Sequence, residues 1–235
     1  AEMKRNYRWK FLLNRDGQIT SSHQGLTWKV GEWKKEEKPL EICSVGLHCS
    51  ENILDALSYV SGEYLARVEV RGEHVSKEDS KEAWSEMRLK KVYRWTKKDS
   101  VALAVFAAEQ VIGIYEKYKP EDKRPRNAIE AAKRWLLGEI SDEELKEVRR
   151  ADAAAAYAYA ATAYATTAAA AYAYATTAAA AYAYAATAYA TTDADAAAYA
   201  YAATATARRK EHKDLYKKIE KWLRRRVKEL EELKK

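Results

Sequence analysis

Two cysteines and a histidine lie close together in the first quarter of the sequence. Cys43 precedes the string Gly46-Leu47-His48-Cys49, which brings two thiols and an imidazole into one short segment. Structural zinc takes four ligands, and its cysteine pairs are usually two to four residues apart. The spacing of Cys43 and Cys49 is longer, and the string offers no fourth ligand. We therefore expect these side chains to pack in the fold, and we predict neither a metal site nor a cofactor.

Aromatic side chains near this string suggest a ligand pocket instead. Trp28 and Trp33 flank Gly31, and flat indole rings can stack on a base or another small planar ligand. His48 and Tyr59 follow in the same part of the chain. We take Trp28, Trp33, His48 and Tyr59 as the candidate pocket. Burial in the core of a sheet is the more common role for such tryptophans, and it stays the preferred alternative.

The string around His48 also resembles part of the ADP-ribosyltransferase-like folds, in which such a strand lines a nicotinamide pocket. That resemblance would make Glu63 or Glu69 the acidic residue. His23, the histidine before the string, lies in a loop-like context. The sequence contains no phosphate-binding glycine-rich loop, no His-Glu-x-x-His motif and no nucleophile elbow. We therefore favour binding over catalysis, assign no catalytic residue, and interpret His48 as a buried imidazole.

The elements that must position these residues form a predicted α+β domain over residues 1–99. Apolar and polar residues alternate in short segments, which predicts strands at 7–13, 28–30, 40–43, 64–70 and 87–95. Apolar residues at helical spacing predict a helix over 52–59, with Ser50 as its N-cap.

Residues 100–150 read as a helical connector. The pattern predicts one helix from Ser100 to Lys117 and another from Asn127 to Leu137, with Pro125 near its start. Ser141 and Glu144 form a capping box for a further helix.

Residues 151–207 are a repeat tract of Ala, Tyr and Thr with three Asp. The fifteen residues of 153–167 recur unchanged at 178–192. Alanine is the best helix former, and no Gly or Pro follows Gly138, so we favour helix. Small residues also recur every five positions, which keeps a β-solenoid open as the alternative. The predicted fold class is therefore an α+β domain followed by an all-α, Ala-rich helical repeat region.

Helical geometry places five tyrosines of the tract on one stripe. This stripe is the predicted face for a protein partner or for self-association, and it consists of Tyr157, Tyr164, Tyr172, Tyr182 and Tyr189.

The net charge of +7 is concentrated in residues 208–235, which read as a basic amphipathic helix. Such a helix could contact nucleic-acid phosphates, although a solvated helix face is the commoner explanation. The candidate contacts are Arg208, Arg209, Lys210, Arg224, Arg225 and Arg226. The chain lacks an apolar run long enough to span a membrane and an apolar signal segment. We expect a protein of the bacterial cytoplasm that does not bind membranes.

Two parts of the sequence resemble known families. The residues Trp28-Lys29-Val30-Gly31, Gly46-Leu47-His48-Cys49 and Val68-Glu69-Val70-Arg71-Gly72-Glu73 resemble an N-terminal domain of unknown function from bacteriophage and prophage proteins. The residues Arg124-Pro125-Arg126, Ala128-Ile129-Glu130-Ala131-Ala132 and Trp135 resemble a group of immunity-like proteins that continue into Ala-rich helical repeats. The resemblance implies a phage or mobile-element origin and supplies no catalytic residues.

These observations favour a non-enzymatic phage or mobile-element accessory protein. It would bind a host or phage macromolecule, in counter-defence or immunity. The first alternative is a structural protein that assembles into an oligomer or filament through the Tyr/Ala repeat. The second alternative is an ADP-ribosyltransferase-like or nucleotide-binding domain that uses the His48 region.

Overall fold

Two compact units make up the chain. In a computed structural model, the first unit comprises Ala1–Trp95 and Glu220–Lys235, and the second comprises Thr96–Ile219. The structure describes residues 6–23, 25–60, 62–77, 81–118, 120–145, 147–148 and 213–233.

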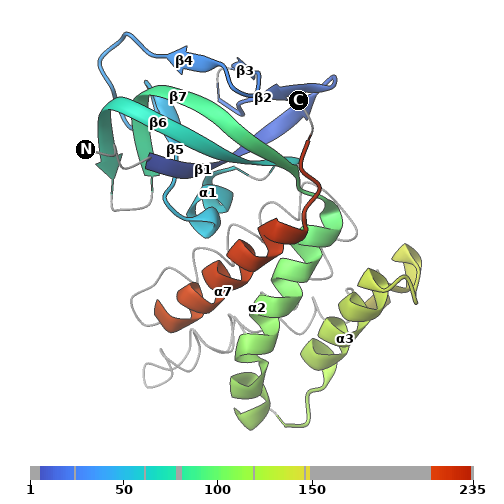
Figure 1. Cartoon of the computed structure of the whole chain (residues 1–235). Helices are drawn as coiled ribbons and strands as arrows, with labels where there is room; N and C mark the ends of the chain where they lie inside the picture. Colours follow the sequence, from blue (N-terminus) through green and yellow to red (C-terminus); the bar gives the residue numbers. More distant parts are fainter. Residues whose placement is uncertain are drawn as a thin grey trace. The chain divides into compact units, whose positions relative to one another are not determined.

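The first unit is built on a seven-stranded antiparallel sheet (Figure 1). Its strand order is β3-β2-β1-β6-β7-β4, and β5 also pairs with β7. The strands are β1 (Asn6–Arg15), β2 (Gln18–Thr20), β3 (Thr27–Trp28), β4 (Trp33–Lys35), β5 (Leu47–Cys49), β6 (Tyr64–Lys77) and β7 (Lys81–Arg94).

The long hairpin of β6 and β7 gives the sheet its curvature. Each strand has 14 residues, and their register shifts between Arg67 and Val68 and again between Arg71 and His74. A β-bulge bends its strand and increases the local twist. Residues 7–94 therefore curl into a half-barrel instead of an open, gently twisted sheet.

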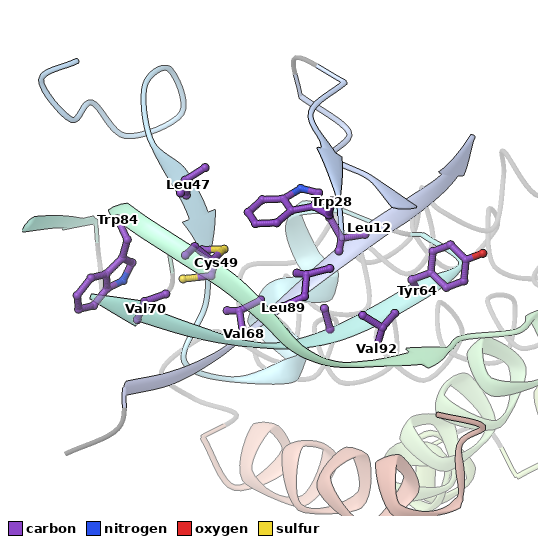
Figure 2. Close-up of a cluster of buried hydrophobic side chains, with 12 residues drawn as sticks. Leu12, Trp28, Leu47, Cys49, Tyr64, Val68, Val70, Trp84, Leu89 and Val92 are labelled. Carbon is purple, nitrogen blue, oxygen red and sulfur yellow. The ribbon is translucent and has the colours of Figure 1, made fainter. Parts of the chain in front are cut away.

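The core of this unit lies inside the curl (Figure 2). Strand alternation directs every second side chain inward, and the inward set is almost entirely apolar. It consists of Leu12, Trp28, Leu47, Cys49, Tyr64, Ala66, Val68, Val70, Trp84, Met87, Leu89 and Val92.

Four short segments cover the outer edge of β7. Strand β5 pairs with residues 82–84 and β4 with residues 86–88. Val30 then bridges to Leu89. The C-terminal segment completes the edge, because the Arg94 N–H donates to the Glu231 carbonyl at 2.9 Å and the Leu233 N–H donates to the Val92 carbonyl at 2.8 Å. An uncovered edge of this length would be a template for aggregation.

The segment of β5 also reaches the opposite side of the curl. Ser50, the residue after β5, exchanges two backbone hydrogen bonds with Trp9 of β1, at 2.8 and 2.9 Å. Because β5 pairs with β7 as well, β1, β6, β7 and the β5 segment form a closed path. The β5 segment therefore closes the half-barrel at one end, its walled end.

A short helix, α1 (Ile53–Tyr59), follows this closure and is capped from a distant part of the chain. Its N-cap residue, Asn52, makes no side-chain capping hydrogen bond. Instead, the Glu220 carboxylate accepts the Ile53 N–H at 3.2 Å and the Leu54 N–H at 3.0 Å. Arg224 lies 2.9 Å from the same carboxylate. Burial raises the pKa of Glu220, and these hydrogen bonds and the arginine act against that rise.

The second unit contains α2 (Lys97–Tyr118) and α3 (Arg124–Leu136). A capping box of Thr96 and Asp99 begins α2, with a 2.6 Å bond between their side chains. The predicted box of Ser141 and Glu144 is present, with the Ser141 N–H donating to Glu144 at 2.8 Å. Helix α7 (Lys213–Arg226) and the 3-10 helix η3 (Val227–Glu229) lead back to the first unit. No helix in the described part of the chain is long and apolar enough to cross a bilayer.

The predicted fold class is wrong. The first unit is a curled antiparallel half-barrel with one short helix, not an α+β domain, because the bulged strands β6 and β7 continue through charged residues that sequence alternation does not register. The all-α repeat region is not shown, because residues 151–207, for which helix and β-solenoid were the alternatives, lie outside the described residues.

Two local predictions are also wrong. The strand expected at 40–43 is a turn, closed by the Glu41 N–H donating to the Val45 carbonyl at 2.9 Å. Ser50 is not the N-cap of α1, because its backbone pairs with Trp9.

Substitution of Glu220 tests the distant cap. Glu220→Ala should lower the free energy of unfolding by about 2 kcal/mol, because two buried N–H groups lose their acceptor. Urea unfolding followed by tryptophan fluorescence measures the change. Glu229→Ala is the matched control, because that exposed glutamate forms a surface ion pair with Arg226, and its loss should cost at most about 0.5 kcal/mol. Equal losses in the two variants would contradict this role of Glu220.

Candidate functional site

A pocket of about 360 Å³ opens at the walled end of the half-barrel. It is bordered by β1, by the loops and short strands of residues 21–49, by α1 and by the start of β7. Its polar and aromatic lining includes Trp9, Lys10, Ser21, His23, Trp28, Glu36, Cys43, His48, Tyr59 and Lys81. Three of the four predicted pocket residues, Trp28, His48 and Tyr59, therefore lie around one cavity.

His48 holds the loop in front of β5. Its Nε2 accepts the Cys43 N–H at 3.0 Å, and the Gly46 backbone also hydrogen-bonds the ring. Cys43 has a positive φ of 68°, which is uncommon for a residue with a side chain. Burial and, to a smaller extent, the charges of Lys81 and Lys10 lower the pKa of His48 to about 4. The imidazole is thus neutral and occupied by the backbone, which makes it a poor general base and a poor metal ligand.

Lys10 extends from β1 toward the inside of the curl. Its Nζ donates to the His48 carbonyl at 2.7 Å and lies 5.9 Å from the centre of the Trp28 ring. Burial lowers the pKa of Lys10 to about 8. Beside it, burial raises the pKa of the Cys49 thiol, so this sulfur stays protonated and unreactive at neutral pH.

Lys81 places a second ammonium group at the pocket. Its Nζ lies 3.5 Å from the Cys43 sulfur and 4.6 Å from the centre of the Tyr59 ring. Its charge is one of the causes that lower the pKa of Lys10. Lys34 and Lys35 also line the pocket, whereas Glu36 is its single carboxylate among the described lining residues. The pocket is therefore cationic and partly aromatic.

Sequence reasoning missed Lys10 and Lys81. Lys10 lies two residues before Leu12 on the predicted first strand. The strand pattern alone therefore directs both side chains to the same face, which is the core face. A lysine at such a position is a signal, because a buried ammonium group is costly. Lys81 had no comparable signal, since β7 begins six residues before the predicted strand.

The fourth predicted pocket residue lies elsewhere. Trp33 is on β4, where the guanidinium carbons of Arg71 and Arg88 lie 3.9 Å and 4.7 Å from the centre of its ring, and it does not line the pocket. The two carboxylates considered for an ADP-ribosyltransferase-like site also lie outside the pocket lining and have other partners. Glu63 accepts the Asn14 N–H at 2.9 Å, and Glu69 pairs with Arg88 at 2.8 Å.

Comparison with known families divides the chain into two matched regions. Residues 16–99 match a domain of unknown function designated DUF7666. Residues 92–230 match the family described as Imm-5 like putative immunity protein. The second match covers more than half of the chain. The chain belongs to the Imm-5-like immunity family. No curated protein and no solved structure matches it.

These matches confirm the two resemblances seen in the sequence, to a domain of unknown function and to immunity-like proteins. Most of the pocket lies in the DUF7666 match, although Trp9 and Lys10 precede it. The Imm-5-like match contains α2, α3 and α7. Within the ranges given above, no group of three or more His, Cys, Asp or Glu side chains is placed to hold a metal ion.

All six candidate nucleic-acid contacts fall within the Imm-5-like match, and three of them are among the described residues. Arg224 pairs with Glu220 and donates to the Asn52 side chain at 3.2 Å, and Arg226 pairs with Glu229 at 2.7 Å. Arg225 is exposed. The remaining predicted contacts lie outside the described residues, as does the predicted partner face: Arg208, Arg209, Lys210, Tyr157, Tyr164, Tyr172, Tyr182 and Tyr189.

The neutral state of His48 makes stability depend on pH. Its pKa is about 4 in the fold and 6.5 in the unfolded chain, so the unfolded state binds more protons between these values. The stabilisation is fully present above pH 6.5 and is lost as the pH falls toward 4. His48→Gln keeps an acceptor for the Cys43 N–H but does not titrate. The free energy of unfolding of this variant should therefore depend less steeply on pH between 4 and 6.5, by the contribution of at most about one proton.

Urea unfolding at several pH values across this window measures the slope. His74→Gln is the matched control, because His74 is an exposed histidine that stacks on Trp84 at 4.3 Å away from the pocket. The control should follow the wild-type slope. A His48→Gln slope that also equals the wild type would show that His48 is not neutral in the fold.

Proposed function

We propose that this chain is an immunity protein that acts by binding and not by catalysis. It binds a toxic or host-directed macromolecule in the bacterial cytoplasm, and its gene belongs to a bacteriophage or another mobile element. The observation that carries this proposal is the Imm-5-like match over residues 92–230. An immunity function protects a cell by neutralising a harmful molecule, and stable binding is sufficient for that purpose.

The chemistry of the pocket supports binding over catalysis. A nucleophile needs a base within hydrogen-bond reach or a lowered pKa. His48 is engaged by the backbone of Cys43 and Gly46, and burial keeps the Cys49 thiol protonated. The reactive side chains that the sequence brings together therefore serve the structure of the loop.

Co-expression tests the proposal. Polypeptides encoded beside this gene are expressed in bacteria under an inducible promoter, with and without the full chain, and growth is recorded. We expect the chain to restore growth against one toxic polypeptide and to co-purify with it. The purified pair then gives the stoichiometry: protection by binding should rise in proportion to the amount of chain and saturate near an equimolar ratio.

Two results would contradict the proposal. Full protection by an amount of the chain far below the equimolar ratio would indicate that one chain inactivates many toxic molecules, as an enzyme does. Absence of protection against every toxic polypeptide encoded beside the gene, by a chain that is folded by circular dichroism, would remove the immunity role.

A further inference from the structure

Two of the lysines that line the pocket, Lys10 and Lys81, have no carboxylate partner among the described residues. The hydrogen bond of Lys10 goes to a neutral acceptor, the His48 carbonyl, at 2.7 Å. Lys81 contacts the Cys43 sulfur at 3.5 Å and the Tyr59 ring. An ammonium group has three donors, and burying it without a counter-charge costs free energy. The pocket thus holds two ammonium groups that an anion would satisfy.

The rest of the lining strengthens the preference for an anion. Lys34 adds positive charge at the pocket, and Lys35, which pairs with Glu37 at 3.8 Å on the surface, also lines it. Glu36, the opposing charge, accepts the Lys38 N–H at 3.0 Å. A pocket lined by one sign of charge concentrates ligands of the opposite sign. Burial and the charge of Lys81 lower the pKa of Lys10, and a bound anion would reverse that effect.

The aromatic lining indicates that the anion carries a ring. Trp28 is fixed by its Nε1 donating to Ser21 at 2.8 Å, and Tyr59 lines the pocket from the end of α1. Rings of this kind pack against planar ligands. The volume of about 360 Å³ is in the range of small-molecule sites.

We propose that this pocket binds a phosphomonoester with a planar base, of the nucleoside monophosphate class. Lys10 and Lys81 hold the phosphate, and the aromatic side chains contact the base. Lysine binds phosphate as a point charge. The site is independent of the immunity proposal, because it is formed by residues 9–81 whereas the immunity proposal is carried by the match over residues 92–230.

Titration of the full chain tests the proposal. AMP and UMP are added to the protein, and binding is followed by calorimetry and by tryptophan fluorescence. Adenosine and uridine lack the phosphate, whereas ribose 5-phosphate and inorganic phosphate lack the base. We expect AMP and UMP to bind at least about 10-fold more tightly than any of these four partial ligands, because the phosphate and the base supply separate contacts.

Substitutions then assign the contacts. Lys10→Met and Lys81→Met should each weaken AMP binding by at least about 10-fold, through loss of a charged contact. Lys90→Met is the matched control, because Lys90 lies on β7 outside the pocket, 3.8 Å from Glu69, and it should bind AMP as the wild type does. If Lys10→Met fails to fold, the affinity of Lys81→Met for AMP tests the phosphate contact.

Three outcomes would overturn the proposal. The first is no monophosphate binding by the wild-type chain at millimolar concentration. The second is equal binding of nucleosides and nucleotides, which would remove the phosphate contact. The third is AMP binding by folded Lys81→Met with wild-type affinity.

Discussion

The structure of the first unit depends on covering the outer edge of β7. This strand has 14 residues, and its other edge is taken by β6. In the described part of the chain this edge is shared by β5, β4, Val30 and the C-terminal segment. Only β5 is continued by a residue that also pairs with β1. That double pairing converts a curled sheet into a half-barrel with a walled end, and the pocket lies there.

The closure also explains the unusual position of Lys10. Alternation along β1 sends Lys10 to the same side as the core residue Leu12. In an open sheet its ammonium group would reach solvent at this end. Pairing of β5 instead places the His48 carbonyl 2.7 Å from Nζ and encloses the amine. The same contact fixes β5 from inside, while His48 fixes the preceding turn through Cys43. The closing strand β5 therefore forms a wall of the cavity and encloses the Lys10 ammonium group beside it.

The sequence predicts the regular elements better than the closure. The strands at 7–13 and 64–70 and the helices α1, α2 and α3 are confirmed, because each has enough residues to display a period. Strand β5 has three residues and is defined by partners 30 or more positions away, so no local pattern reveals it. For the same reason, residue type alone suggested Trp28, His48 and Tyr59 as pocket residues, whereas the contact of Trp33 with two arginines depends on the pairing of β4 with β7.

The two family matches are not two separate folding units. The Imm-5-like match begins at residue 92, inside β7, and extends to residue 230. Its last part belongs to the sheet unit, where Glu220 caps α1 and residues 231–233, just beyond the match, complete the β7 edge. Since α1 borders the pocket, the capping glutamate stabilises a wall of a site that lies almost wholly in the other match. A fragment ending at residue 99 would leave two helical N–H groups and one strand edge without partners, so any activity of the pocket must be measured on the full chain.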